Sequence, residues 1–302
     1  MATPLTTAAF DIPTSDLGRI EERVKDQSIL ASLSPERPSL YGNVEAVRMS
    51  RKPRAQIVAE GAQKDSDTAG WESVTASPIK VQTTIRMTDE VKWADSDHRL
   101  MIVDDLIEAL SGSVARAVDL VGLHAINPIT GSVANSVQDY LTQTDHRVVA
   151  GGAPTAEIEA AAGTILGARY VPTGVAFDTS YAFNLATERD SEGRKLHPDL
   201  GFGTQISSVS GLTAATSSTV SGQPEASDTG VRAIVGDFTQ MRWGFQRRFP
   251  VEVIQYGDPD GNGDLKGNNQ IAYRVEGVFY VAVFDKDGFV VIEEEIEPGE
   301  GD

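Results

Sequence analysis

One short stretch of the sequence has the residue types of a cation-binding loop: DPDGNGDLKGNN, residues 258–269. In the calcium loop of an EF-hand, oxygen ligands stand at positions 1, 3 and 5, a glycine at position 6 and a bidentate glutamate at position 12. Asp258, Asp260 and Asn262 occupy the first three ligand positions, and a glycine follows. Position 12, however, is Asn269, and the flanking runs predict strands instead of helices. We therefore expect a polar turn with no resident metal ion.

The other residues that could do chemistry are isolated from one another. The absence of cysteine excludes a disulfide framework and a thiolate metal site. None of the four histidines forms an H-E-x-x-H pair. His98 and His124 stand at the two ends of a long helical pattern, where solvated or capping roles are expected. With no phosphate-binding lysine motif and no G-x-S-x-G turn, the sequence predicts no enzyme and no catalytic, cofactor-binding or metal-ligating residue.

Charge and hydropathy exclude further classes of protein. The chain has 302 residues, 40% of them hydrophobic, and a formal net charge of −18. Such an acidic chain is not expected to bind nucleic acid, because phosphate contact needs a basic face. No apolar run approaches the roughly 18 residues of a membrane span, and the first residues lack the pattern of a secretory signal. We expect a globular protein with no membrane partner.

The elements that would position any functional residue begin with extended segments. VEAVRM, RAQIVAEGA and IKVQTTIRMTDEV alternate in polarity between residues 44 and 91. They predict a strand in residues 41–53 and a long hairpin over residues 54–90, which must protrude because two strands alone cannot bury both faces. A protruding hairpin needs a partner to cover it. The apolar residues expected to make that contact are Trp71, Val74 and Ile79.

For Trp71, packing within the hairpin is an equally good alternative. A basic cluster lies beside the hairpin and consists of Arg48, Arg51, Lys52 and Arg54. These residues are either contacts to an acidic neighbouring surface or a solvated run of charges.

The clearest element is a long amphipathic helix from about residue 97 to residue 126. Its start can be capped by Asp95, Ser96 or Asp97, and Asn127-Pro128 ends it. At ~1.5 Å per residue, roughly 30 residues make a rod about 45 Å long, which suits a scaffold spanning two domains. Apolar residues form one stripe at helical spacing: Val103, Leu106, Ile107, Leu110, Val114, Ala117, Val118 and Val121.

The second half of the chain predicts helices at about 155–170 and 178–190 with the strand VPTGVAF between them. Residues 200–230 are rich in Ser, Thr and Gly, which is typical of a mobile or partner-ordered loop. The runs RAIVGDF, MRWGFQRRF, VEVIQY and IAYRVEGVFYVAVF then predict strands, and an acidic tail follows.

Two stretches in this order of elements resemble the major capsid proteins of tailed double-stranded-DNA phages, especially those infecting actinobacteria. VARAVDLVGLHAINPITG is similar to the end of that family's spine helix. VGDFTQMRWGFQRRFPVEVIQYGDPDGNGDLKGNNQIAYRVEGVFYVAVFDKDGFVVIE is similar to its final strands. The resemblance covers nearly the whole chain and implies an α+β, HK97-like fold.

The resemblance also implies a division of the chain: an N-terminal arm (1–40), a strand of the peripheral or P domain (41–53), the E-loop hairpin (54–90), and a P-domain segment with the spine helix (91–145). An axial or A domain (146–235) and returning P-domain strands with the acidic tail (236–302) would follow. The implied function is self-assembly into pentamers and hexamers of an icosahedral shell that encloses DNA without sequence-specific binding. The implied location is the virion, after assembly in the bacterial cytoplasm.

Portal and scaffolding proteins and a decoration protein are the candidate partners besides the chain itself. The alternative within the resemblance is the shell protein of an encapsulin nanocompartment. An extracellular calcium-binding or carbohydrate-processing enzyme would need a signal sequence and an acidic pocket, and the sequence predicts neither. Some relatives join subunits through an isopeptide bond between an E-loop lysine and a late asparagine. Lys64 and Asn268 or Asn269 could supply those two groups, but Val275 stands where the assisting carboxylate is expected, so we predict no cross-link.

Overall fold

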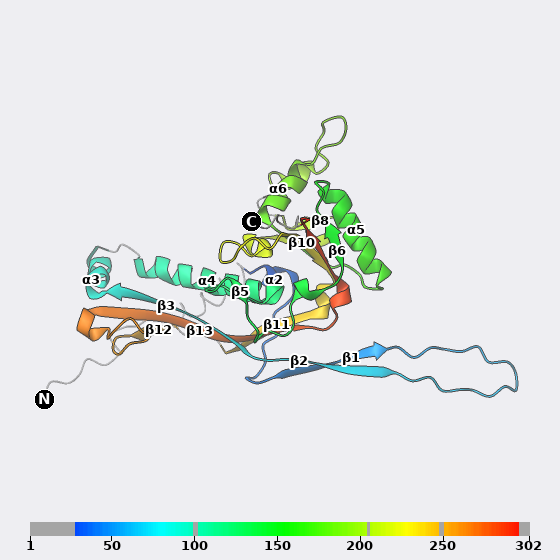
Figure 1. Ribbon diagram of the computed structural model, residues 1–302, viewed down its shortest axis with the longest axis horizontal. Coiled ribbons are helices and arrows are strands. Elements are labelled where there is room, and N and C mark those ends of the chain that lie inside the picture. The colour runs from blue at the N-terminus through cyan, green and yellow to red at the C-terminus, as the bar shows by residue number, and fades with distance from the viewer. Residues whose placement is uncertain (1–27, 99–101, 204–205, 248–250, 296–302) are drawn as a thin grey trace, which may run out of the picture.

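The computed structural model describes residues 28–98, 102–203, 206–247 and 251–295. An elongated lower unit, an upper unit with two helices and a long projecting hairpin are visible in Figure 1. The helices are α2 (Ile29–Leu33), α3 (Asp89–His98), α4 (Ile102–His124), α5 (Pro154–Gly167) and α6 (Thr179–Thr187). The strands are β1 (Val44–Arg51), β2 (Gly70–Ala76), β3 (Ile79–Thr88), β4 (Ile126–Asn127), β5 (Ser132–Val133), β6 (Arg147–Val149), β7 (Gly174–Phe177), β8 (Ser208–Val209), β9 (Leu212–Thr216), β10 (Val231–Gly236), β11 (Met241–Arg247), β12 (Val251–Ile254), β13 (Gln270–Val283) and β14 (Phe289–Glu293).

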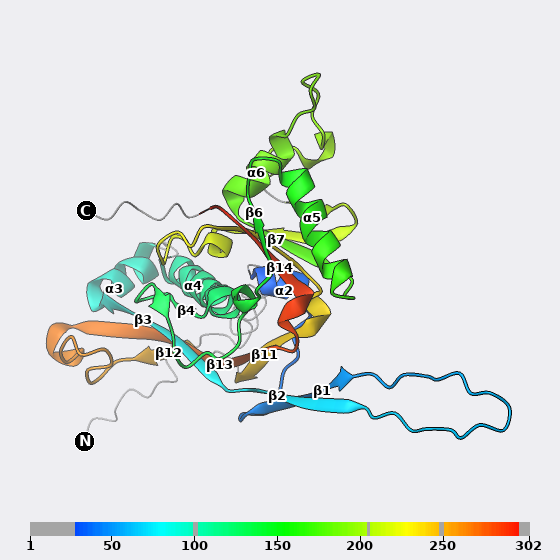
Figure 2. The same ribbon diagram turned by 45° about the vertical axis from the view of Figure 1, so that its right-hand side comes forward.

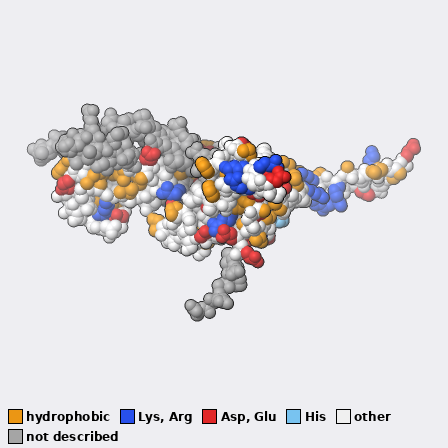
Figure 3. Space-filling view, turned by 90° about the horizontal axis from the view of Figure 1, so that it is seen from above, with side chains coloured by type: hydrophobic (Ala, Val, Ile, Leu, Met, Phe, Trp, Pro, Cys, Tyr) orange, Lys and Arg blue, Asp and Glu red, His pale blue; other side chains and the backbone are white. Residues whose placement is uncertain are grey.

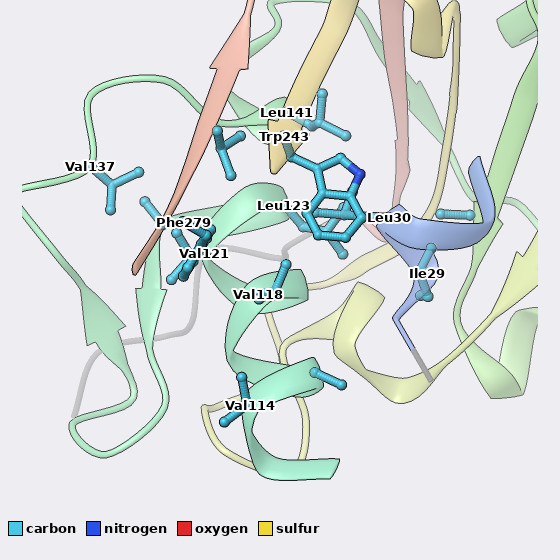
Figure 4. Close-up of a cluster of buried hydrophobic side chains, with 14 of the residues drawn as sticks. Ile29, Leu30, Val114, Val118, Val121, Leu123, Val137, Leu141, Trp243 and Phe279 are labelled. Atoms are coloured by element: carbon cyan, nitrogen blue, oxygen red, sulfur yellow. The ribbon is translucent and has the colours of Figure 1, made fainter. Parts of the chain in front are cut away.

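The lower unit is a four-stranded sheet covered by α4. Strand β13 pairs along one edge with β12 and then β11, and along its other edge with β3 over ten residue pairs. Nearly every residue of the 14-residue strand β13 is buried, because most of its side chains are apolar. Its inward side chains meet the apolar stripe of α4 in the main core, part of which Figure 4 shows.

The upper unit is a six-stranded sheet in the order β6-β14-β10-β7-β9-β8. Helices α5 and α6 pack on this sheet through a second core that contains Ile165, Phe177 and Leu185. Strand β14 follows β13 after a short turn, so the chain passes from one sheet directly into the other. The predicted helices and strands of the second half of the chain are therefore confirmed.

Helix α4 confirms the predicted apolar stripe but not its predicted start. Leu110, Val114, Ala117, Val118 and Val121 are buried, Leu106 is half-buried, and the side chains of Val103 and Ile107 lie outside the described residues. The cap expected at residues 95–97 is wrong, because these residues belong to the separate helix α3. Helix α3 also takes residues 89–91 out of the expected strand.

The predicted boundaries of the hairpin are wrong at both ends. Strand β1 pairs with β2, so the hairpin begins at Val44 and its paired part ends at Ala76. Strand β3 belongs instead to the four-stranded sheet, since its half-buried side chains pack on the main core. Figure 2 shows the hairpin leaving the lower unit as a narrow arm.

Residues 200–230 do not form the expected mobile loop. They contain β8 and β9 of the six-stranded sheet and a short 3-10 helix, Ser218–Ser221, whose Val220 is fully buried. Thr219 and Ser221 of this 3-10 helix are buried, whereas Ser207, Ser208, Ser210 and Thr213 are exposed. The loop that projects from the upper unit is residues 188–203, in which Phe202 is 71% exposed.

Residues 28–40, the described part of the predicted N-terminal arm, pack on the main core and form no separate core of their own. Leu30 is fully buried, and Figure 4 shows it beside α4 and Trp243. The buried carboxylate of Asp119 accepts hydrogen bonds from Ser28 Oγ at 2.5 Å and from the backbone nitrogens of Ile29 and Leu30 at 3.0 and 3.2 Å. The first 27 residues of the arm and the acidic tail beyond residue 295 lie outside the described residues.

Candidate assembly surface

The hairpin is the part of the described chain that is least covered by its own fold. Beyond the last pair, Arg51 with Gly70, the two segments run on without ladder pairing to a turn in which the Ala62 amide donates to the Ala59 carbonyl at 3.0 Å. Nearly every residue of this outer part is exposed, including Ile57. Because the backbone polar groups of such a segment are free to bind another chain, the hairpin is a candidate assembly surface.

An apolar patch lies on one face of the paired part of the hairpin. Met49 is directly opposite Trp71, and Val47 is two residues away on the same face. These side chains are 40%, 62% and 66% exposed respectively. The alternative that Trp71 packs fully within the hairpin is therefore not what the structure shows. We call Val47, Met49 and Trp71 the outer patch.

The opposite face of the hairpin turns toward the lower unit. Ala76 is buried against Tyr280 and Ala282, with Val44 and Phe284 half-buried at the edge of this small cluster. Val74 is half-buried and lines a cleft of about 600 Å³ between the hairpin and the turn after β13. The apolar contact of this face is thus made within the chain and is small.

Ile79, the third predicted contact residue, is not part of the hairpin. It begins β3 opposite Phe279 and packs on the main core. Ile79 therefore lies outside the hairpin, and its contact with a neighbouring subunit stays a prediction.

The basic cluster is largely paired within the chain. Arg48 binds Glu72 of β2 at 2.9 Å and also Asp285 in the turn after β13. Arg51 and Arg54 both bind Asp67, at 2.9 and 3.1 Å.

The Arg54 backbone amide and guanidinium lower the pKa of Asp67 below its usual value, so this carboxylate stays ionised. Lys52 is exposed and has no ion pair within the described residues. In Figure 3, Lys and Arg side chains gather on the inner half of the arm.

The loop between β12 and β13 holds a cation, but that cation is an arginine side chain. Arg86 Nε donates to both carboxylate oxygens of Asp260 at 2.8 and 2.9 Å, and Nη2 donates to Asp258 at 2.9 Å. Arg86 also lowers the pKa of Asp260 well below its usual value. Among the described residues there is no cluster of side chains that could hold a metal ion. The turn expected at residues 258–269 is confirmed.

The strand position at which an assisting carboxylate was expected holds Val275, and the carboxylate beside Asn268 is that of Asp264, which accepts the Gly267 amide at 2.7 Å. Val275 is fully buried in the main core, and Glu276 lies on the other face of β13, where it binds Lys80 at 2.9 Å. The Asn268 side-chain amide donates to the Asp264 carbonyl at 2.8 Å.

A groove of about 610 Å³ lies between β3 and α4. Its floor is apolar, with Val81, Val114 and Val121 among the lining residues, and Ile129 at its edge is 87% exposed. Arg116 and Glu225 form an ion pair at the same groove. An apolar groove beside an exposed isoleucine is a typical site for another protein segment.

His124 is buried, so the expected solvated or capping role is wrong. Its Nε2 lies 2.8 Å from the Val220 carbonyl oxygen, and the neutral ring donates a hydrogen bond to that oxygen. Burial lowers the pKa of His124 to about 4. His124 therefore links α4 to the segment after β9 as a neutral side chain. The other predicted helix-end histidine, His98, ends α3, and its side chain lies outside the described residues.

Three residues of the candidate surface were not predicted from the sequence. Val47 and Met49 carry an alternation signal in VEAVRM, but only the pairing of β1 with β2 shows which face is exposed. Asp285 has no sequence signal, since its partners Arg48 and Tyr170 are more than 100 residues away along the chain.

Comparison with known proteins identifies the family. The model of the "Phage capsid family" matches residues 10–293 of the chain. The chain belongs to the phage capsid family. This capsid chain is 39% identical to a chain of Mycobacterium phage Ogopogo, with 89% of this chain and 92% of that chain covered and a TM-score of 0.84. It is 31% identical to a chain of Gordonia phage Cozz, with coverages of 90% and 87% and a TM-score of 0.79.

More distant matches share only the fold with this capsid chain. One structure, "Capsid of native GTA particle computed with C5 symmetry", has 13% identity and a TM-score of 0.59 over 97% of this chain and 94% of that chain. No curated protein matches the sequence.

The predicted identity, a major capsid protein of an actinobacterial phage, is confirmed. The capsid chain is thus a structural protein of a virion shell with a mixed α/β fold. None of its described helices is long and apolar enough to cross a lipid bilayer.

Proposed function

We propose that this capsid chain assembles into pentamers and hexamers of an icosahedral shell with the HK97-like arrangement of N-terminal arm, E-loop, P domain and A domain. The observation that supports the proposal most strongly is the outer patch of Val47, Met49 and Trp71, which the subunit leaves exposed on a projecting arm. A subunit that folded to act alone would gain nothing from extending such an arm into solvent.

The proposed contact is between the hairpin of one copy and the groove between β3 and α4 of the next. An apolar patch on the first copy would then cover an apolar floor on the second, with charged residues such as Lys80 and Arg116 at the rim. Because patch and groove are different surfaces, the contact is heterologous, and repeated contacts of this kind close into rings. Each subunit in a ring would give one arm and receive another.

The projecting loop of the upper unit is the candidate for the ring centre. Residues 188–203 carry exposed Leu196 and Phe202, and Lys195 lies 5.5 Å from the Phe202 ring centroid. We expect this loop to differ between pentamers and hexamers, since one chain must fit two ring sizes.

The proposed contents of the shell are double-stranded DNA held without sequence-specific contacts. A net charge of −18 supports this, because a negative lining repels phosphate and lets the duplex remain mobile. Portal, scaffolding and decoration proteins are proposed partners. The encapsulin alternative is less well supported, because the relatives above 30% identity come from phages.

Electron microscopy of the purified chain, together with a change confined to the arm, tests the proposal. Residues 55–66 are replaced by Asn-Gly in one variant and by a Gly/Ser linker of equal length in another. The Arg54 backbone amide donates to the Asp67 carboxylate at 2.8 Å, so the two ends of the replaced segment lie close together. We expect shells or capsomers from the unaltered chain and soluble, folded, unassembled protein from both variants.

The circular dichroism spectrum and melting temperature of each variant serve as controls for folding. Normal shells from the Asn-Gly variant would refute the role given to residues 55–66 in assembly. An unaltered chain that stays monomeric at high concentration would refute the proposed function as a whole.

A further inference from the structure

The direction of the hairpin depends on very little apolar packing. The cluster that joins the hairpin to the lower unit contains only Ala76, Tyr280 and Ala282 as buried residues, with Val44 and Phe284 at its edge. The buried atoms lie at the inner end of the two strands, so this cluster can act as a pivot. It does not by itself fix the angle of the arm.

A polar contact farther along the arm can fix the angle that the apolar cluster leaves free. Arg48 of β1 reaches across the cleft beside Val74 and binds Asp285, which lies in the turn between β13 and β14. The Tyr170 hydroxyl, from the segment after α5, donates to the same Asp285 carboxylate at 2.5 Å. Burial and the adjacent carboxylate raise the pKa of Tyr170 to about 12, so this hydroxyl remains a donor. One side chain therefore joins the hairpin, the lower unit and the upper unit.

We propose that Asp285 is a positioning residue that sets the angle at which the hairpin leaves the subunit, by holding Arg48 and Tyr170 at one carboxylate. The proposal deepens the proposed function, because it explains how the arm is aimed at a neighbouring copy before any contact forms. Glu72, the other partner of Arg48, lies on β2 of the same hairpin and cannot contribute to this angle.

The leverage of this contact follows from strand geometry. At ~3.3 Å per residue, Arg48 lies roughly 13 Å from the pivot at Val44, and the turn at Gly61 lies roughly 55 Å from it. Loss of the ion pair lets the charged groups separate by about 2 Å, the change from direct contact to a water-separated pair. That change corresponds to about 8 Å at the end of the arm.

Single-molecule energy transfer measures the angle directly, and at the high dilution it uses, subunits stay unassembled. The chain has no cysteine, so Ala62→Cys at the end of the arm and Glu159→Cys on α5 give two unique, exposed labelling sites. Two variants break the proposed contact. Arg48→Met removes it from the hairpin side, and Asp285→Asn removes the charge but keeps an oxygen that can accept the Asp287 amide of the turn.

Two matched variants, Glu72→Gln and Asp67→Asn, remove ion pairs that lie within the hairpin. We expect one narrow population for the unaltered chain and for both matched variants. Arg48→Met and Asp285→Asn should give a population that is broader or shifted by about 8 Å. Their melting temperatures should change little, because a partly exposed ion pair adds little stability.

The outcomes separate this proposal from the proposed function. An unchanged energy-transfer distribution in both Arg48→Met and Asp285→Asn would overturn the positioning role, whatever happens to assembly. A changed distribution in these two variants but not in the matched pair would support it. If the distribution changes while shells form with normal yield and size, Asp285 positions the arm, and the role of the arm in assembly is refuted instead.

Discussion

Two neighbouring segments of this capsid chain are held in opposite ways. Residues 28–42 lie along the body, where Arg37 N donates to the Trp243 carbonyl at 2.9 Å and Trp243 Nε1 donates to the Ser34 carbonyl at 2.9 Å. The hairpin that follows, residues 44–76, leaves its apolar side chains in solvent and rests on a small cluster and an ion pair. The two segments are separated by one residue.

This difference distinguishes contacts made within one subunit from contacts made between subunits of the shell. Burial fixes the position of residues 28–34, since a side chain such as Leu30 has one place in which it is fully covered. Few buried contacts fix the position of the hairpin. Its remaining contacts must therefore come from another copy of the chain. The N-terminal segment therefore contributes to folding, and the hairpin contributes to assembly.

The largest contrast is between Trp243 of β11, which donates a hydrogen bond to Ser34, and Trp71 of the hairpin. Trp243 is fully buried and Trp71 is 62% exposed. We expect Trp243→Ala to lower the free energy of unfolding by about 3–5 kcal/mol, through the cavity and the lost hydrogen bond to Ser34. Trp71→Ala should change it by less than about 1 kcal/mol and yet reduce shell yield. Chemical denaturation and electron microscopy of both variants check this; equal loss of stability would refute the contrast.

A smaller effect is expected where the N-terminal segment touches β11. A Cβ at Gly244 would lie 2.1 Å from the Arg37 carbonyl oxygen, so Gly244→Ala must push the segment away. We expect a loss of about 1–3 kcal/mol and faster hydrogen exchange at the Arg37 amide.

Gly163→Ala in helix α5 is the matched control, since nothing lies within 4 Å of the added carbon. It should stabilise the chain by about 0.5–1 kcal/mol. Unchanged exchange at Arg37 in Gly244→Ala would show that the segment is not held there.

The pH dependence of stability should reflect two buried titratable side chains, Asp119 and His124. Burial raises the pKa of Asp119 to about 6 and lowers that of His124 to about 4. The contribution of Asp119 is therefore present at low pH and lost as pH rises through 6. The contribution of His124 is present above about pH 6.5 and lost as pH falls toward 4.

These two contributions oppose each other between pH 7 and pH 5, each by about 1–2 kcal/mol. We expect His124→Gln to gain stability relative to the unaltered chain on going from pH 7 to pH 5, and Asp119→Asn to lose it. Urea unfolding at both pH values measures the change. Parallel pH profiles for all three proteins would contradict the assignment.

For Lys64→Ala we expect no change in the covalent state of the shell. Lys64 lies on the exposed outer arm, and the position for an assisting carboxylate is occupied by buried Val275. Boiling purified particles in detergent with reductant should release a single band near 32.3 kDa, the same for the unaltered chain and Lys64→Ala. A ladder of covalent oligomers that disappears in Lys64→Ala would overturn the prediction.

Local patterns predicted much of the fold. The stripe from Leu110 to Val121, the strands of the second half and the polar turn at 258–269 were all predictable, because periodicity and turn chemistry act over a few residues. The boundaries of the hairpin were not. An alternating run such as IKVQTTIRM is equally suited to a free hairpin and to the edge of a sheet, and only the long-range pairing of β3 with β13 separates the two.

The candidate site shows the same division between local and long-range information. Trp71 and the basic cluster were predicted from composition near the hairpin, but the face of the outer patch and the partners of Arg48 were not. The Ser/Thr/Gly composition of residues 200–230 suggested mobility, whereas small side chains also allow close packing, as at Val220. Composition does not distinguish these outcomes, because both depend on whether a neighbouring element is present.

From the sequence alone, the body of α4, the helices α5 and α6, most strands, the acidic charge and the membership in a capsid family could be predicted, since these depend on local patterns and on residues aligned with relatives. The tertiary structure alone established that Ile29, Leu30 and Ser34 are buried, that Arg86 occupies the acidic turn and that Asp285 contacts both Arg48 and Tyr170. Each of those results joins residues far apart along the chain. Their contact depends on how whole sheets pack, which no short stretch of sequence encodes.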